Sequence, residues 1–405
     1  MHLGAFQAIL ERRLRPESRR PIAVAFSGGG DSLALLLAAS DWAMAVGRDL
    51  LVLTVDHRLQ TDSAAWTKAC AATAARLGLP FEPLAWTDEK PETGLSAAAR
   101  DARHRLLADA ARAAGASVIL MGHTGDDILE ARLMRERRSS TPEPREWTPS
   151  PAWPEGRGVF LLRPLLGLRR AEIRDWLVER GESWIDDPAN ESPLSVRAQA
   201  RRDIGGRHAA PTPASEMAAA APLALACRQN AAAGLQILRA ELAAAPSGAG
   251  RFLSAACLCA AGTSRPPPRE AVQRLAERLA APGGFTTTLA GARVEADGDE
   301  VRFLREAGEA ARGGLAPLTL AAGRTGVWDG RFEIAADTAM EVRSAAGLRA
   351  DLSPADQQML AALPASARDT VPVIGGKGGP RLAEARPLAL DRLLAACGAV
   401  EIEPV

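Results

Sequence analysis

The sequence predicts an α/β protein whose N-terminal part forms a doubly wound parallel sheet of five strands in the order 3-2-1-4-5. Two observations indicate this fold. Short apolar runs alternate with Ala- and Leu-rich helical segments along residues 21–180, which is typical of a parallel sheet covered by helices on both faces. The first apolar run, residues 22–26, also ends in a glycine-rich turn that leads directly into a helix.

The chain has 405 residues, which is more than one average domain. We expect a first domain over residues 1–205, a helical middle domain over residues 216–312 and a small α+β domain over residues 313–405. A Gly-, Pro- and Ala-rich stretch at residues 204–215 predicts a linker after the first domain.

Each element of the first domain follows from a local pattern. Apolar, partly β-branched runs predict strands at residues 22–26, 49–55, 81–86, 117–121 and 159–162. Helix-forming segments between them predict helices at residues 33–40, 63–77, 96–114, 125–138 and 170–180. Residues 139–158 hold many prolines and no periodicity, so we expect an exposed loop there.

The turn after the first strand predicts an anion site. It consists of Ser27, Gly28, Gly29, Gly30, Asp31 and Ser32. Glycines let backbone N–H groups approach an oxyanion closely, and the following helix directs its positive end toward it. Asp31 can hold a metal ion, and Ser32 can cap free amides. The turn is not a Walker A loop, because no Gly-Lys-Ser/Thr follows.

The predicted topology brings a second polar loop to this turn. Ligands of a doubly wound sheet bind where the strand order reverses, outside the carboxyl ends of the strands. The fourth strand ends at Gly122 and His123, so its loop should meet the glycine turn. Asp56 and His57 end the second strand beside them, where an adenosine could sit. The histidines show no metal-ligand spacing and have no Cys partner, so we do not expect a zinc site. Because His57 and His123 end strands at the expected site, we expect them to donate hydrogen bonds rather than to act as bases.

Three acids, Asp126, Asp127 and Glu130, begin the helix after the fourth strand and share one face. Clustered carboxylates repel one another unless a cation lies among them. That cation could be Mg²⁺ or a substrate ammonium, and the alternative is an acidic first turn that only satisfies the helix dipole.

Arginines supply nearly all of the basic charge, and the net charge is +0. Arg100 and Arg103 lie one helical turn apart and could neutralise a triphosphate, or they could form a solvated face. Further arginines flank the Pro-rich loop and close the first domain, which suits binding to a nucleic-acid backbone or a merely charged surface.

The remaining composition indicates a cytoplasmic protein. The five cysteines form no Cys-x-x-Cys pair, which predicts buried thiols in a reducing compartment. The N-terminal stretch has no signal-peptide apolar region, and no apolar run is long enough to span a membrane.

Taken together, these motifs resemble a known family. Residues 27–32 resemble the PP-loop of the ATP pyrophosphatases, and residues 20–205 resemble tRNA(Ile)-lysidine synthetase. The matching motifs are VDHxL at 55–59, A-R-x-x-R at 99–103, the GHxxDD segment at 122–130, Arg135 and Arg138, RPLL at 163–166, R-x-E-I at 170–173, W-x-x-D-x-x-N at 184–190, and Arg197 and Arg201. The chain departs from the family pattern at His104, Ile128, Ala131 and Ala198, which leaves a catalytically weakened homologue open.

The resemblance implies an adenine nucleotide alpha hydrolase-like fold and a two-step ligation. ATP with Mg²⁺ adenylates the C2 oxygen of the wobble cytidine of tRNA-Ile (CAU anticodon), and the side-chain amine of L-lysine then displaces AMP. The product, lysidine, changes codon reading from AUG to AUA and charging from Met to Ile. The partners implied are tRNA-Ile, L-lysine and ATP, and a homodimer is one assembly that we consider.

The resemblance also implies roles for individual residues. Those expected to bind ATP are residues 27–32 with Asp56, His57, Gly122 and His123, and Asp31 would meet Mg²⁺ through the phosphates. Those expected to be catalytic are Asp31, Arg100, Arg103, Asp127 and Glu130, while Asp126, Asp127 and Glu130 would hold the lysine. Those expected to bind tRNA are Arg135, Arg138, Arg163, Arg197 and Arg201.

Three other readings remain open from the residues. A tRNA thiolase would need cysteines near the loops, where Cys70 is the sole candidate. An ammonia-using ligase shares the PP-loop but neither RPLL nor the Trp/Asp/Asn segment. A non-catalytic tRNA- or nucleotide-binding protein would account for the departures from the family pattern.

Overall fold

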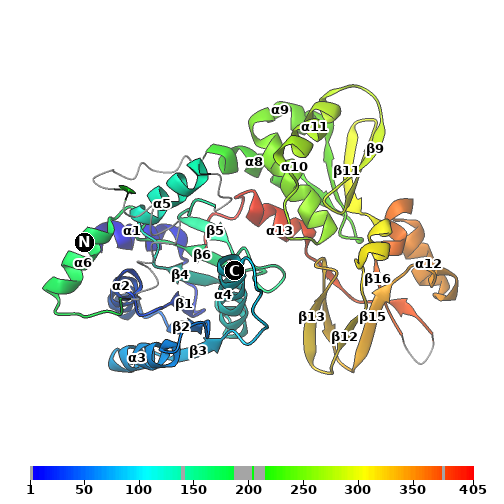
Figure 1. Ribbon diagram of the computed structural model, residues 1–405. Helices are drawn as coiled ribbons and strands as arrows, with labels where there is room; N and C mark the ends of the chain where they lie inside the picture. The colour runs from blue at the N-terminus through cyan, green and yellow to red at the C-terminus, as the bar shows by residue number, and fades with distance from the viewer. Residues whose placement is uncertain (1–2, 138–141, 187–202, 205–214, 376–378) are drawn as a thin grey trace. The chain divides into compact units, whose positions relative to one another are not determined.

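The computed structural model describes residues 3–137, 142–186, 203–204, 215–375 and 379–405. The chain divides into two compact units (Figure 1). The first unit is Met1–Thr212 together with Val400–Val405, and the second is Pro213–Ala399. Among the described residues, no helix combines the length and the apolar character that a membrane crossing requires.

The first unit is built on one six-stranded sheet of order β3-β2-β1-β4-β6-β5. Its parallel strands are β1 (Ile22–Ala25), β2 (Leu50–Asp56), β3 (Phe81–Ala85), β4 (Val118–Met121) and β6 (Phe160–Leu162). Central strand β1 pairs with β2 and with β4, so Ala23 lies between Leu51 and Ile119. The predicted order of five parallel strands is confirmed.

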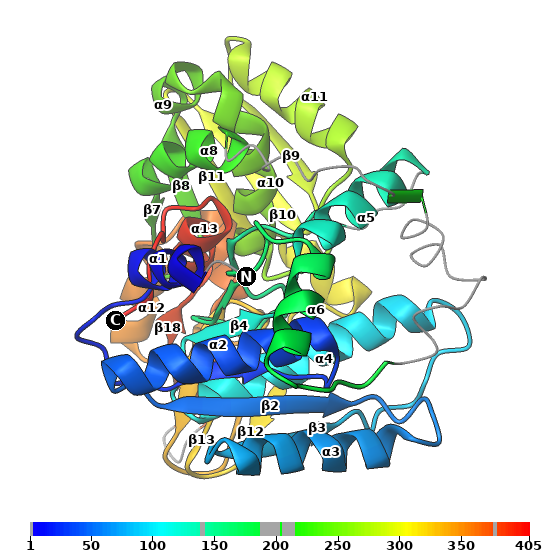
Figure 2. The same cartoon turned by 90° about the vertical axis from the view of Figure 1, so that its left-hand side faces the viewer.

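Helices cover both faces of this sheet. They are α1 (Leu3–Arg13), α2 (Gly30–Val46), α3 (Ser63–Arg76), α4 (Leu95–Ala113), α5 (Gly125–Glu136) and α6 (Arg170–Glu179). Figure 2 shows α2 and α6 in front of the sheet and α4 behind it. Leu107 of α4 packs in one apolar cluster with Ala23, Leu53 and Ile119 of the strands, because alternate strand residues point to the same face. This arrangement is the expected doubly wound one.

The Pro-rich segment differs from the expected exposed loop. Strand β5 (Trp147–Pro149) pairs antiparallel with β6 and extends the sheet at its edge. Trp147 is buried, and its ring stacks on Phe160 with 4.8 Å between centroids. Burial of the large apolar ring of Trp147 stabilises this edge strand, although the many prolines of the segment predict an exposed loop. Residues 138–141 of the segment lie outside the described part of the chain.

The last residues of the chain are integrated into the first unit. Trp147 Nε1 donates to the carbonyl of Val400 at 2.8 Å. The buried Glu403 carboxylate accepts from the Arg15 amide at 3.0 Å and the Ser18 hydroxyl at 2.9 Å, and it forms an ion pair with Arg48. Both charged side chains are at most 5% exposed, so each relies on the other for its counter-charge.

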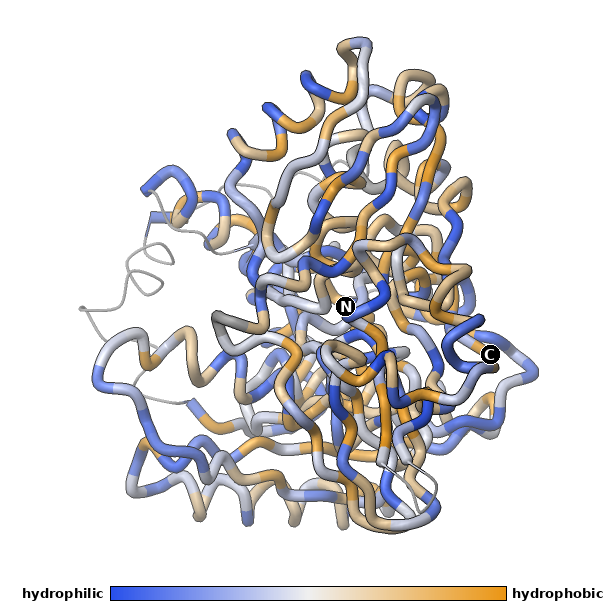
Figure 3. Tube along the Cα trace, turned by 90° about the vertical axis from the view of Figure 1, so that its right-hand side faces the viewer, coloured by the Kyte–Doolittle hydropathy of each residue, from blue (hydrophilic) through white to orange (hydrophobic). Residues whose placement is uncertain are grey.

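The second unit contains helices and three antiparallel sheets. Its helices are α8 (Ser215–Ala226), α9 (Arg239–Ala244), α10 (Pro246–Ala261), α11 (Arg269–Ala280), α12 (Pro354–Ala361) and α13 (Ala389–Ala396). Figure 3 shows hydrophobic and hydrophilic residues alternating along these elements. One apolar cluster runs from Ala220 to Cys397 and includes residues of both halves of the unit. Residues 216–312 and residues 313–399, which we expected in two separate domains, thus contribute to one core, whereas residues 400–405 belong to the first unit.

The sheets of the second unit follow β7-β8-β11-β10-β9, β12-β15-β16-β17 and β13-β14-β18. Their strands are β7 (Arg228–Gln229), β8 (Leu235–Leu238), β9 (Phe285–Leu289), β10 (Ala292–Asp297), β11 (Glu300–Arg305), β12 (Leu318–Leu320), β13 (Arg324–Trp328), β14 (Phe332–Ala336), β15 (Met340–Ser344), β16 (Pro372–Ile374), β17 (Arg381–Leu382) and β18 (Arg386–Pro387). The expected strands after residue 313 are present. The sheet around residues 228–305 was not predicted, because its short strands lie among Ala-rich helical segments.

A buried charge network joins the two halves of this unit. Arg305 donates to both carboxylate oxygens of Asp329 at 3.0 Å, and Arg331 donates to the same carboxylate at 2.7 Å. Arg331 also donates to the carbonyls of Ala232 and Thr370. Bidentate guanidinium–carboxylate pairs fix orientation as well as charge.

We predict that Glu403→Ala strongly destabilises the first unit. The change leaves the Arg48 guanidinium buried without its counter-charge, which costs about 3–5 kcal/mol. Urea denaturation of the full chain measures the loss as a lower transition midpoint. Glu401→Ala is the matched control, since Glu401 is exposed and lies two residues away. Equal midpoints for the two variants would contradict the structural role of the Glu403 carboxylate.

Candidate active site

The glycine turn between β1 and α2 has the backbone that an anion site requires. Gly28 has a φ of +83°, a value that favours glycine. A Cβ at this position would lie 2.6 Å from the side chain of Ile185, whose amide donates to the Gly28 carbonyl at 2.9 Å. The segment after α6 therefore packs against the turn, and any other residue at position 28 would strain the backbone and displace the Ile185 side chain.

Ser32 fixes the turn from within. Its hydroxyl donates to the Gly29 carbonyl at 2.9 Å and accepts from the Ser27 amide at 3.2 Å. The N-cap residue of α2 is Gly29, which has no side chain to cap the first amides of the helix. The positive end of the helix is thus open to an anion.

The loops after β1 and β4 meet as predicted. A Cβ on Gly122 would lie 3.0 Å from Ser32 Cα and 3.1 Å from the Asp31 carbonyl, so a larger residue would force the two backbones apart by a few tenths of an ångström. His123 follows, and its Nδ1 accepts from Arg163 Nε at 3.2 Å.

Asp126 of the acidic group is bound by Arg170, the first residue of α6, and by Arg169 immediately before it. Arg169 donates to both of its carboxylate oxygens at 3.0 Å, and the Arg170 amide donates at 2.7 Å. Burial alone would raise the pKa of Asp126, but these hydrogen bonds outweigh it and hold the pKa below its ordinary value. Asp126 is therefore a carboxylate that anchors α6 to α5.

The side chain of Arg170 lies among the other acids. Its Nε donates to Asp31 at 2.9 Å and its Nη1 to Glu130 at 3.2 Å, while Nη2 is 3.8 Å from Asp127. Burial disfavours the charge of Arg170, but the three carboxylates outweigh burial and raise the pKa of the guanidinium. We expected Mg²⁺ or a substrate ammonium at this position, whereas a guanidinium of the chain itself lies there.

Arg170 belongs to the R-x-E-I motif, but no pattern in the sequence predicted a site role for Arg170 or for Arg169. The signal that could have found both was the charge balance, because three clustered acids require cations nearby. A pair of consecutive arginines at the start of the predicted helix 170–180 was the nearest source.

The four acids differ in their surroundings. Asp127 accepts from the amide of Thr124 at 2.8 Å and from its hydroxyl at 3.1 Å, which makes it part of a capping box at the start of α5. Glu130, one turn further, is 1% exposed. Burial raises the pKa of Asp31, and the nearby Arg170 offsets only part of this effect. The capping function that we weighed as an alternative thus holds for Asp127.

A second group of charged side chains beside the acids is cationic. Arg100 and Arg103 of α4 act on Arg163, whose pKa falls to about 10 through burial and through these two like charges. His104 is buried next to them, and burial together with Arg103 and Arg100 lowers its pKa to about 2. Neither ring nitrogen of His104 has a hydrogen-bond partner within the described part of the chain. His104 is therefore a neutral group at physiological pH.

The expectation that Arg163 contacts the tRNA backbone needs correction. Arg163 is 5% exposed and donates to the Arg145 carbonyl at 2.8 Å and to the Thr148 hydroxyl at 3.1 Å. The Arg163 guanidinium is buried, and its hydrogen bonds hold His123 and strand β5 in place. It is therefore not on the surface, where a tRNA backbone could reach it. Arg135 is accessible and pairs with Glu143. Arg138, Arg197 and Arg201, as well as Asp187 and Asn190, lie outside the described residues.

The end of β2 has a different character. Asp56 accepts from the Arg58 amide at 2.8 Å, and the His57 ring meets Trp86 edge-on at 6.1 Å. Burial and the charge of Arg103 lower the pKa of His57, so its imidazole is mainly neutral at physiological pH. Lys90 lies 3.6 Å above the Trp86 ring.

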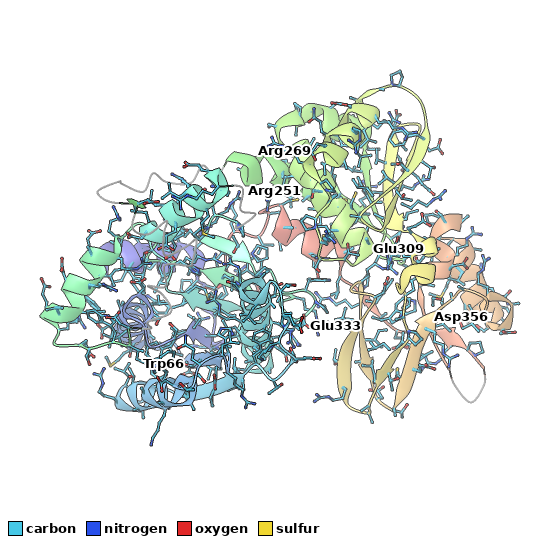
Figure 4. All side chains as sticks on the ribbon, viewed as in Figure 1. Trp66, Arg251, Arg269, Glu309, Glu333 and Asp356 are labelled. Atoms are coloured by element: carbon cyan, nitrogen blue, oxygen red, sulfur yellow. The ribbon has the colours of Figure 1, made fainter. Side chains whose placement is uncertain are left out.

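Two further observations concern metals and thiols. Within the described ranges, no three His, Cys, Asp or Glu side chains are arranged to hold a metal ion. The five cysteines are all buried and none forms a disulfide, as predicted from the sequence. Burial raises the pKa of Cys70, the one cysteine beside the glycine turn. Figure 4 shows the described side chains on the ribbon.

Comparison with known proteins agrees with this geometry. The PP-loop domain family matches residues 4–207. The chain is 46% identical to the tRNA(Ile)-lysidine synthase of Caulobacter vibrioides, over 100% of both chains. It is 34% identical to the Hyphomonas neptunium protein of the same name, over 78% of this chain and 91% of the relative. It is 36% identical to that of Rhizobium meliloti, over 78% of this chain and 73% of the relative. The chain belongs to the tRNA(Ile)-lysidine synthase family.

Proposed function

We propose that this protein ligates L-lysine to C2 of the wobble cytidine of tRNA-Ile with a CAU anticodon. ATP first transfers AMP to the C2 oxygen and releases pyrophosphate. The lysine side-chain amine then attacks C2, AMP leaves with that oxygen, and the nitrogen gives up a proton. The observation that carries this proposal is the anion-binding PP-loop held directly against an acidic group in a member of this family. The product would change codon reading from AUG to AUA and charging from Met to Ile.

The cationic side of the site suits the first step. The open N-terminus of α2 and the PP-loop amides would bind the phosphates of ATP. Arg100 and Arg103 would neutralise charge as pyrophosphate leaves. Asp56 and His57, at the end of β2, would lie near the adenosine. His123, fixed by Arg163, would present one imidazole face to the site.

The residues also fit a magnesium ion bound mainly through phosphates. Mg²⁺ commonly takes one or two carboxylates and leaves its other positions to substrate phosphates and water. Asp31 at the start of α2 would be that carboxylate, and its partly exposed side chain is next to the open helix end. The ion would neutralise charge on the triphosphate.

The acidic side suits the second step. Asp126, Asp127 and Glu130 would attract the ammonium of lysine, which must lose one proton before its nitrogen can attack. Activation of the oxygen as AMP makes a poor leaving group good, and holding both reactants in one site supplies much of the remaining rate. A Cys-dependent thiolation is less well supported, because burial makes the Cys70 thiol a poor nucleophile.

We predict that Asp31→Ala abolishes ATP-dependent adenylation and leaves the fold intact. Asp31 is the only acid inside the glycine turn, so no neighbour can take over its contact. Pyrophosphate release with tRNA-Ile and ATP measures the effect. Asp41→Ala, in the same helix on an exposed ion pair, is the control and should keep its activity. Normal pyrophosphate release by a folded Asp31→Ala protein would contradict the proposal.

A second prediction separates the two half-reactions. Glu130→Gln should spare adenylation of the cytidine and raise the lysine concentration needed for the second step by about ten- to a hundredfold. Loss of one charge-assisted hydrogen bond is worth about 1.5–3 kcal/mol, which gives this range. Adenylated tRNA and lysidine are measured separately across a lysine titration. A loss confined to adenylation would show that the acids serve Mg²⁺ instead.

A third prediction concerns tRNA. Affinity should fall steeply with added salt, because guanidinium–phosphate contacts release counterions. Arg135→Gln should weaken tRNA binding and reduce the slope of log affinity against log salt concentration by about one. Arg76→Gln, which removes a surface ion pair with Glu182, should change neither the affinity nor the slope. Filter binding from low to high salt measures both. Salt-independent binding would argue for a small-molecule ligase.

A further inference from the structure

The side chain of Arg170 reaches two different helices of the site. Its guanidinium contacts Asp31 at the start of α2, and also Glu130 and Asp127 on α5. Arg169, its neighbour, contacts the side chain of Asp126 on α5. Arg170 therefore connects the phosphate end of the site with the end assigned to lysine.

Arg170 competes for the same carboxylate oxygens that would receive a substrate ammonium. Glu130 is 1% exposed, and Arg170 Nη1 lies 3.2 Å from its Oε1. Two cations bound to one buried carboxylate repel each other, so an incoming ammonium must weaken or break this contact. If lysine binds only when this internal contact is open, the apparent dissociation constant of lysine rises as the open fraction of the protein falls.

We propose that Arg170 is a positioning residue that holds Asp31 for the first step and is displaced from Glu130 by the lysine ammonium in the second. The inference rests on the proposed function and deepens it. Lysine binding and the orientation of the PP-loop aspartate are thereby coupled through one guanidinium.

Loss of the Arg170 charge should have opposite effects on the two half-reactions: it should impair adenylation and favour the binding of lysine. Arg170→Gln removes the orienting bond to Asp31, so the rate of adenylation should fall by about tenfold. The same change removes the competitor for Glu130, so the lysine concentration at half-saturation should fall by about three- to tenfold. General damage to the fold would slow adenylation and raise the lysine requirement together.

The experiment compares the full-length chain with Arg170→Gln, Arg170→Lys and Arg180→Gln. Adenylated tRNA and lysidine are quantified separately across titrations of lysine and of Mg²⁺. Arg180 lies at the other end of α6 in an exposed pair with Asp41, so Arg180→Gln should match the parent in both steps. Arg170→Lys keeps the charge but lacks the planar fork that spans several carboxylates, so adenylation should fall while the lysine requirement stays close to that of the parent.

The outcomes are distinct. A higher or unchanged lysine requirement in Arg170→Gln would overturn the inference. If that variant does not fold, Arg170→Lys decides, and unchanged adenylation in it would overturn the inference as well. A change only in the Mg²⁺ requirement would likewise overturn it. A parent protein that forms no lysidine would overturn the proposed function itself, which is separate from failure of the Arg170 inference in an active parent.

Discussion

The site depends on the neutralisation of four carboxylates that lie at the N-terminal ends of two helices. Asp31 on α2 and the acids of α5 would repel one another in a partly buried setting. Arg169 and Arg170, which begin α6, supply the opposing charge. These contacts fix helices α2, α5 and α6 to one another at the carboxyl ends of the strands. Because the PP-loop leads directly into α2, the same contacts fix the position of the PP-loop.

The charges of the site are separated into two adjoining groups. Arg100, Arg103 and Arg163 form a cationic side, and the acids form an anionic side, with Asp127 close enough to act on Arg163. Phosphates favour the first side and an ammonium favours the second. His104, one of the departures from the family pattern, stays uncharged beside these arginines and so leaves the separation intact. Such a division suits a reaction that handles a triphosphate and an amine in turn.

The path of the chain adds a second constraint. Residues 213–399 leave the first unit and the chain then returns to it, so that Val400–Val405 pack on α1 and the adjoining loop. The buried pair of Arg48 with Glu403 holds this return. The first unit is consequently complete only when the end of the chain is in place, although its sheet is built from residues before 163.

The sequence by itself determined the elements whose signals are local. The strands of the parallel sheet, the glycine turn and the acidic first turn of α5 each follow from residues within one short window, because strand periodicity, glycine backbone freedom and helix-end charge act over a few residues. The meeting of Gly122 with the PP-loop also followed, since topology rules fix where strand ends gather.

Only the tertiary structure decided the partners of charged groups that lie far apart in the chain. Arg170 and Asp31 are 139 residues apart and Arg48 and Glu403 are 355 apart, and no local pattern encodes which guanidinium reaches which carboxylate. The burial of Arg163 and of Trp147 likewise depends on the edge strand β5, which a Pro-rich sequence did not predict. Burial and long-range charge pairing are properties of the packed chain. A charged group that loses its water on folding must be paired with an opposite charge, and packing determines which opposite charge lies within reach.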